Sequence, residues 1–227
     1  MSLPFSEEQF LGVFARYNAL IWPLQPLAWI LAATAVALVV RSADRRRASV
    51  AVGALLALFW VLSGAGYHLL SFSTLSPAAY VFGAAFLIEA ALLLEEAVRR
   101  RRLRFAVPGG WRRSAGAAAL GYALVLYPLI GWLSGRPLAQ GPYLGVAPCP
   151  TMIFTAGLLL WADGPARLRV VAIPLLWGAV GTVAALRLGV LEDLGMTVTA
   201  GILAVAYLPL RRTGRGSAAR DAAEVSR

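Results

Sequence analysis

The chain has 227 residues, of which 59% are apolar and 14% are charged, and its formal net charge at pH 7 is +10. A soluble domain usually has about 45–50% apolar and about 25% charged residues, so this composition excludes an ordinary soluble globular protein. All 21 basic residues are arginine, and the lack of lysine excludes Schiff-base chemistry, including that of a seven-helix retinal protein.

One cysteine and one histidine limit the chemistry of any site. A single cysteine cannot form an internal disulfide, and one histidine cannot supply two axial ligands to haem or three ligands to a catalytic zinc ion. The sequence also has no G-x-x-x-x-G-K phosphate loop, so ATP is not expected as a direct partner. No cofactor is expected.

Residues 1–18 are predicted to form an amphipathic helix on the outer surface of a membrane. Ser6 and Gln9 match the capping-box pattern that begins a helix. Apolar side chains follow at helical spacing: Phe10, Val13, Phe14, Tyr17 and Ile21. The helix would either shield the ends of other helices as a lid or take part in gating. No positive stretch precedes an apolar core here, so a signal peptide is not expected.

Apolar runs of the length that crosses a hydrocarbon layer, about 20 residues, fill most of residues 19–210. They predict an all-α polytopic membrane protein with seven transmembrane helices and a short, broken fifth helix. The predicted spans are 19–40, 49–71, 78–97, 114–133, 150–162, 169–186 and 194–210. Residues 211–227 are predicted to be a disordered basic cytoplasmic tail.

Arginines near the ends of the spans predict the orientation. All but three of the 21 arginines lie in connections on one side of the seven spans. The three exceptions are Arg16, Arg136 and Arg187. The N-terminus is therefore predicted to be outside, and the protein to be a multi-pass component of the bacterial cytoplasmic (inner) membrane. The basic clusters are expected to contact anionic lipid headgroups, and no nucleic acid is expected because aromatic stacking residues are not interleaved with them.

The fifth span departs most from a plain helix. From Thr151 to Trp161 it has only 11 residues, about 17 Å of helix against a hydrocarbon thickness of about 30 Å. Residues 135–148 contain three prolines and three glycines and cannot form a regular helix. Non-helical backbone at membrane depth survives only inside protein or beside a wet cavity. The sequence therefore predicts an outward-open polar cavity at the Cys149 turn.

Cys149 lies between Pro148 and Pro150 at the start of this helix. A helix N-terminus offers free N–H groups to a ligand and favours a reactive thiolate. Two interpretations stay open: Cys149 and Thr151 contact a ligand, or Cys149 is a small buried residue beside a structural turn.

Other polar residues fall near the same depth or on the outer side. Glu89 lies inside the third span and is either a proton-coupling group or a neutral carboxyl bonded to a neighbouring helix. His68, near the outer end of the second span, is either a ligand-binding residue or a structural one. Glu192 and Asp193 either form an acidic mouth that attracts cations or cap the seventh span.

Several of these residues lie in stretches that resemble a bacterial family of seven-span membrane proteins catalogued as a domain of unknown function. The stretches are Cys149-Pro150-Thr151-Met152-Ile153-Phe154-Thr155, Tyr127-Pro128, Tyr67-His68, and Phe5 to Phe10 with Tyr17-Asn18. The resemblance covers nearly the whole chain and implies the same seven-helix fold. It brings no known activity, and it adds Tyr127 to the candidate ligand-binding residues.

Three functions stay open. A small-solute or ion transporter is favoured because transporters commonly place a shortened helix against irregular backbone; Cys149 and His68 would be candidate ligands for a soft metal ion. A thiol enzyme would use Cys149 as nucleophile and His68 as base. A non-catalytic membrane subunit, with a protein partner or as a homo-oligomer, would pack through the small residues Gly178, Gly181 and Thr182.

Overall fold

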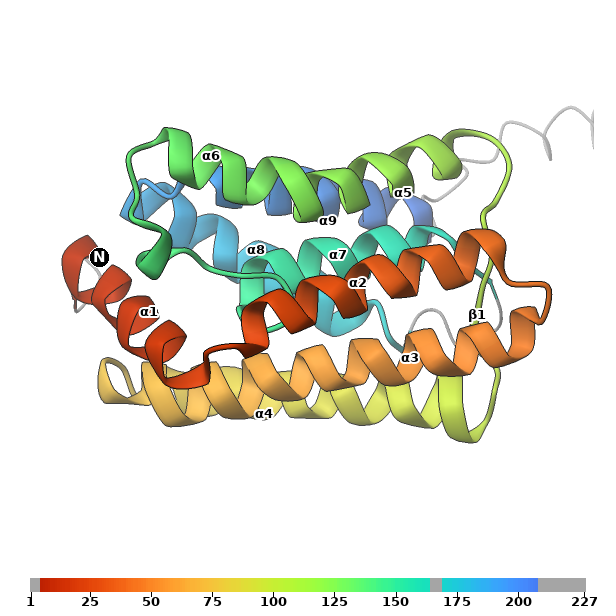
Figure 1. The fold of residues 1–227 in the computed structure, drawn as a ribbon, viewed down its shortest axis with the longest axis horizontal. Coiled ribbons are helices and arrows are strands. Elements are labelled where there is room, and N and C mark those ends of the chain that lie inside the picture. The colour runs from red at the N-terminus through yellow and green to blue at the C-terminus, as the bar shows by residue number, and fades with distance from the viewer. Residues whose placement is uncertain (1–4, 164–168, 208–227) are drawn as a thin grey trace, which may run out of the picture.

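The computed structural model describes residues 5–163 and 169–207, and these residues are almost entirely helical (Figure 1). The all-α fold class is confirmed. The predicted tail at 211–227 and Arg167 lie outside the described residues.

The α-helices are α1 (Glu7–Ile21), α2 (Leu24–Arg41), α3 (Arg45–Val61), α4 (Ala78–Leu93), α5 (Trp111–Gly121), α6 (Tyr127–Leu133), α7 (Pro148–Leu160), α8 (Ala172–Leu188) and α9 (Leu194–Tyr207). Three of them continue directly into π-helical stretches: η1 (Leu62–Ser71) after α3, η3 (Leu94–Arg99) after α4, and η4 (Tyr122–Leu126) between α5 and α6. Short 3-10 turns are η2 (Phe72–Thr74), η5 (Leu138–Gln140) and η6 (Leu191–Asp193).

Each apolar segment predicted as a span is helical over most of its length. In the described part of the chain, three rods are long and apolar enough to cross a membrane: Leu24–Arg41, Arg45–Thr74 and Trp111–Leu133. The prediction that all seven segments cross a membrane goes beyond these three and stays a prediction. At the N-terminus, α1 begins with the predicted capping box, in which Ser6 and Gln9 bond to each other's backbone.

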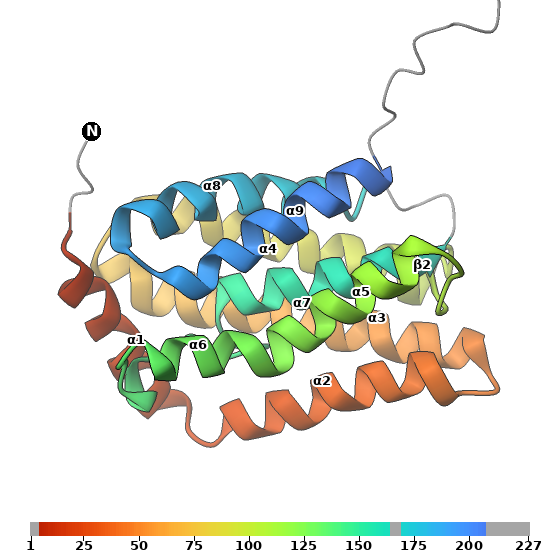
Figure 2. The same cartoon turned by 90° about the horizontal axis from the view of Figure 1, so that it is seen from above.

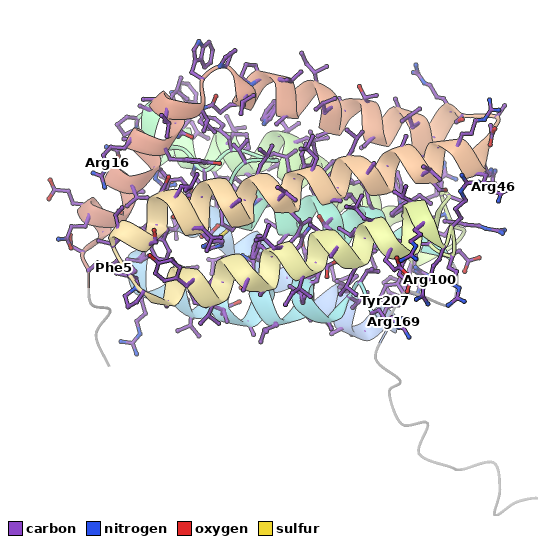
Figure 3. All side chains as sticks on the ribbon, turned by 90° about the horizontal axis from the view of Figure 1, so that it is seen from below. Phe5, Arg16, Arg46, Arg100, Arg169 and Tyr207 are labelled. Carbon is purple, nitrogen blue, oxygen red and sulfur yellow. The ribbon has the colours of Figure 1, made fainter. Side chains whose placement is uncertain are left out.

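The connections between rods gather at two ends of an elongated bundle (Figures 1 and 2). The α1 end holds α1, η2, residues 134–147 and η6. The opposite end, here called the arginine end, holds the connections at 42–44 and 100–110. Figure 3 shows Arg46, Arg100 and Arg169 at the arginine end, and Phe5 and Arg16 at the α1 end. The arginines within residues 5–163 and 169–207 are thus sorted along the bundle in the way the alternation in the sequence predicts.

A two-residue ladder at the arginine end ties two connections together. Strand β1 (Arg104–Phe105) pairs antiparallel with β2 (Ala162–Asp163). The side chain of Ser49 accepts a hydrogen bond from the Phe105 N–H at 2.9 Å, and Arg112 donates to the Ala162 carbonyl at 3.1 Å. These contacts close the arginine end of the bundle, where the C-terminal end of α7 lies.

Small residues of α8 pack against another helix of the same chain. A Cβ at Gly178 or Gly181 would collide with Ala200 or Met196 of α9, and Thr182 hydrogen-bonds to Thr197 at 2.7 Å. The small-residue face that could have met a partner protein therefore packs α8 against α9.

Helix α7 lies at the centre of the bundle (Figures 1 and 2). All of its 13 residues except Cys149 are buried. A helix enclosed on every side is apolar all round, which explains why its sequence shows no polar face.

Candidate functional site

The backbone leading into α7 is irregular and buried. Helix α7 begins at Pro148, and the residues before it, including Leu144, Val146 and Ala147, are non-helical yet at most 1% exposed. The chain therefore enters the bundle from the α1 end as coil and becomes helical only inside it (Figure 1).

Gly145 is the residue that lets this coil approach its neighbours. Its φ is +83°, a left-handed conformation that favours glycine. A Cβ there would lie 2.8 Å from the Cβ of Ala28 and 3.0 Å from the ring of Phe59. Its N–H donates to Thr151 Oγ1 at 3.0 Å, which ties the coil to the first turn of α7.

The depth of α7 follows from its contact with the longest rod. Ser63 Oγ lies 3.5 Å from Thr151 Oγ1. Ser63 precedes the end of that rod at Thr74 by 11 residues, or about 16 Å of helix. The first turn of α7 therefore lies roughly 16 Å below the α1 end.

Helix α1 holds the irregular segment in place. The Asn18 side-chain amide donates to the carbonyls of Ala139 and Gly141 at 2.9 and 2.8 Å. The Tyr17 hydroxyl donates to the Val146 carbonyl at 3.1 Å. These bonds support the interpretation of α1 as a lid that is fixed to the coil beneath it.

The start of α7 offers few backbone donors. Pro148 and Pro150 have no N–H, and the Thr151 N–H donates to the Ala147 carbonyl at 3.4 Å. Only Cys149 is left to present a free N–H in this turn. The two prolines therefore leave fewer backbone donors for a ligand than a helix N-terminus usually offers, and ligand binding by this turn stays a prediction.

Side chains supply the polar groups instead. The thiol of Cys149, which is half-buried, hydrogen-bonds to the carboxyl group of Asp193 and interacts with the indole of Trp177. The Tyr127 hydroxyl donates to Asp193 Oδ1 at 2.6 Å. This acidic neighbour opposes the effect that a helix N-terminus has on a thiol. We call Cys149, Asp193, Tyr127 and Trp177 the Cys149 cluster.

Asp193 has an unusual protonation equilibrium. Burial raises its pKa from 3.8 to about 6, while the bonds from Tyr127 and Cys149 and the charge of Arg136 act in the opposite direction. Its carboxyl group therefore changes charge close to neutral pH.

Glu192 and Asp193 do not form an acidic mouth. Glu192 forms an ion pair with Arg136, and the two side chains are 1% and 8% exposed. Gly131 leaves room for this pair, because a Cβ there would lie 3.0 Å from Glu192 Oε1. Both acidic side chains are buried and paired, so the cation-attracting interpretation is wrong. The prediction for Asp193 also missed Tyr127, which donates a hydrogen bond to its buried carboxyl group.

His68 is enclosed by aromatic rings: Tyr67, Phe72, Phe82, Phe86 and Trp177, at centroid distances of 4.8 to 6.1 Å. Neither of its ring nitrogens has a hydrogen-bond partner among the described residues. The Cys149–His68 dyad that a thiol enzyme would need is therefore not formed in this structure.

Glu89 is fully buried on α4, and neither carboxyl oxygen has a hydrogen-bond partner in the described part of the chain. The structure therefore does not show the hydrogen bond from a neighbouring helix that one interpretation of Glu89 expects. Within residues 5–163 and 169–207, no three His, Cys, Asp or Glu side chains come together as a metal site, so Cys149 and His68 gain no third ligand of these types.

Two pockets are lined in part by residues of the segment 127–143. An open groove of about 840 Å³ runs between α1, α2 and residues 128–143, and its walls include Trp22, Trp29 and Tyr143. A pocket of about 20 Å³, enough for one water, is lined by Tyr127, Arg136 and Glu192. Cys149 lines neither. The groove is lined mainly by apolar side chains, and the outward-open polar cavity at the Cys149 turn stays a prediction.

π-Helical stretches flank the Cys149 cluster. Tyr67 and His68 lie on η1, and Tyr127 directly follows η4. Such stretches are frequent at functional sites. Helical periodicity alone gave no sign of them.

The comparisons with known proteins bear on this arrangement. A family model described as "Family of unknown function (DUF6064)" matches residues 7–219. The chain belongs to this family. No curated protein and no solved structure matches it.

Some of the residues that carried the family resemblance contact the start of α7 or one another. Cys149 and Tyr127 both contact Asp193, and Thr151 bonds to the Gly145 turn. Tyr67 packs against Tyr17 at a ring distance of 5.6 Å. Sequence reasoning missed Trp177 as a neighbour of Cys149. It could have paired Arg136 with Glu192, since Arg136 is one of only three arginines on that side.

Proposed function

We propose that the chain is a seven-span protein of the bacterial cytoplasmic membrane, with α1 outside and the arginine end in the cytoplasm. The three long apolar rods support membrane insertion, and α4, α7, α8 and α9 lie alongside them. The concentration of arginines at one end supports the orientation. At that end the arginines bind anionic lipid headgroups.

We further propose that the protein transports a small solute or ion through the region of the Cys149 cluster. The observation that carries this proposal is the coil before α7, which is buried over residues 144–147 and ends about 16 Å inside the bundle at the first turn of α7. A helix that starts inside the membrane next to irregular backbone is typical of transporter binding sites. In this proposal the solute gains access to the cluster when α1 and the coil move together.

A soft metal ion is a less favoured solute than a proton-linked or organic one. Thiolate and imidazole suit soft metals, but such a site needs more than two protein ligands. Cys149 bonds to Asp193, while His68 lies among aromatic rings that include Trp177.

The test uses the fact that Cys149 is the only cysteine. Intact cells are treated with a membrane-impermeant maleimide, and modified protein is counted by mass spectrometry. Cys149 is expected to react from outside, more slowly than an exposed cysteine because it is half-buried.

Two matched variants in a Cys149→Ser background serve as references for a cysteine that external maleimide reaches and for one that it does not reach. Ser134→Cys, exposed at the α1 end, should react at once, and Ala43→Cys, exposed at the arginine end, only after the membrane is permeabilised. If Ser134→Cys reacts and native Cys149 stays unmodified however long the exposure, no path reaches the cluster and transport by this route is refuted. A solute that slows the reaction of Cys149 identifies the substrate class.

A further inference from the structure

Glu89 has the environment of a neutral carboxyl group. Its side chain is 0% exposed, and neither oxygen has a hydrogen-bond partner among the described residues. An ionised carboxylate inside a membrane is energetically costly, and an unpartnered buried one cannot recover that cost from neighbours. The carboxyl group is therefore stable here only with a proton bound.

Its level in the bundle follows from how α4 packs against the α3–η1 rod. A Cβ at Gly64 would lie 2.9 Å from the Cβ of Phe86, and one at Gly53 would collide with Ala97. The two helices are antiparallel, so this register places Glu89 level with Trp60. Trp60 donates to Thr155 of α7 at 2.9 Å. Glu89 thus lies near the middle of the bundle, at the level where Trp60 contacts α7.

No charged group faces Glu89 from the elements packed around α4, which are α3, η1, η2 and α8. The arginines of α3 lie at its far end, and Arg187 of α8 is exposed at the α1 end. On the face of Glu89 itself, the next acidic residue is Glu96, which pairs with Arg169 at 3.3 Å. The titratable groups on the α1 side are His68 and Tyr67.

The two sides of Glu89 differ in polarity. Toward the arginine end, the rods pack closely at Gly53 and Ala97. Toward the α1 end, both nitrogens of His68 and the hydroxyl of Tyr67 are buried without partners. His68 and Phe86 are in ring contact at 4.8 Å, and His68 contacts Trp177 of the Cys149 cluster at 5.2 Å. Toward the arginine end the corresponding atom on the face of Glu89 is Glu96 Oε2, whose carboxyl group is already paired with Arg169. More of the buried polar atoms able to hold water therefore lie on the side that leads to the Cys149 cluster.

From this arrangement we propose that Glu89 is a proton-binding site in exchange with the α1 end, and that the proton is the ion coupled to transport. Binding forms one O–H bond on the carboxylate, and release returns the proton through the region of His68. The inference rests on the proposed transport function, which it deepens by naming the coupled ion.

The experiment measures the protonated carboxyl directly and needs no substrate. Dicyclohexylcarbodiimide adds to protonated carboxyl groups in apolar surroundings, and mass spectrometry locates the adduct. Right-side-out membrane vesicles are held at one inner pH while the outer pH is raised from about 5.5 to about 9.5. Glu89 is expected to be modified, and above its titration midpoint the rate should fall about tenfold per unit of outer pH, as for one proton.

Three variants make the result specific. Glu89→Gln, which keeps the shape of the side chain, should lose the adduct. Glu96→Gln removes a buried carboxyl that has an ion pair and should leave modification of Glu89 unchanged. His68→Phe keeps the aromatic packing, removes both nitrogens, and should slow the response of Glu89 to a jump in outer pH.

A rate that follows the inner pH, a rate that does not change with either pH, or an adduct that persists in Glu89→Gln would overturn the proposal. These outcomes are separate from the test of transport. If external maleimide modifies Cys149 while the modification rate of Glu89 does not change with the outer pH, the proposed solute route is supported and the proposed proton site is refuted. If the modification rate of Glu89 follows the outer pH in a protein whose Cys149 is never modified, the proposed proton site is supported and the solute route through Cys149 is refuted.

Discussion

At the scale of single residues, Asp193 joins three elements that are distant in sequence. Its carboxyl group receives bonds from Tyr127 after η4 and from Cys149 at the start of α7. The neighbouring Glu192 is held by Arg136. Removing one partner from a buried group of this kind leaves the other without a bond, which costs more than the bond itself contributes.

The titration of Asp193 predicts how stability depends on pH. Its folded pKa, about 6, lies above its usual 3.8, so folding favours the protonated form. This stabilisation is complete below the unfolded pKa and is lost as pH rises through 6. Between pH 5 and pH 7.5 the Asp193 contribution to the free energy of unfolding should fall by about 1–2 kcal/mol.

Thermal unfolding in detergent at the two pH values checks this, with Asp193→Asn as the comparison. The asparagine variant should lose that part of the pH dependence, because it has no proton to release. An identical pH dependence in both proteins would refute the assignment.

At the scale of elements, the entry into α7 depends on the Gly145 turn. Gly145→Ala combines a left-handed backbone with contacts to Ala28 and Phe59 that are too short for a Cβ. Gly135 has nearly the same φ, +82°, but a Cβ there would meet nothing within 4 Å. Gly135→Ala therefore measures the backbone strain alone, about 1–2 kcal/mol.

We expect Gly145→Ala to destabilise the protein by about 1–3 kcal/mol more than Gly135→Ala, because the core must also shift to admit the methyl group. Thermal unfolding of the two variants in one detergent gives the difference. Equal losses of stability would mean that the coil does not press against α2 and α3.

At the scale of the whole molecule, the sequence predicted what depends on local pattern. Apolar runs gave the helical segments, Ser6 and Gln9 gave the start of α1, and the prolines and glycines of 135–148 gave the interruption before α7. These features follow from spacing and from the backbone chemistry of proline and glycine.

The site could not be predicted in the same way because its contacts are long-range. Asp193 meets Cys149 and Tyr127 only after the bundle has formed, and near-neighbour spacing contains no trace of that. Pro148 and Pro150 already indicate in the sequence that backbone N–H donors are missing at the start of α7. The ligand-binding prediction rested instead on the dipole of the helix N-terminus. Trp177 reached the thiol by tertiary packing of α8.

The central claim is that α7 begins inside the bundle, well below the α1 end, and one distance tests it most directly. Spin labels are attached at native Cys149 and at Ala43→Cys, and the separation is measured by double electron–electron resonance in lipid nanodiscs. The 30-residue rod Arg45–Thr74 is about 45 Å long, and Cys149 is predicted to lie about 30 Å from position 43 along it. A separation of about 45 Å, the full length of the rod, would place the start of α7 at the surface and contradict the account.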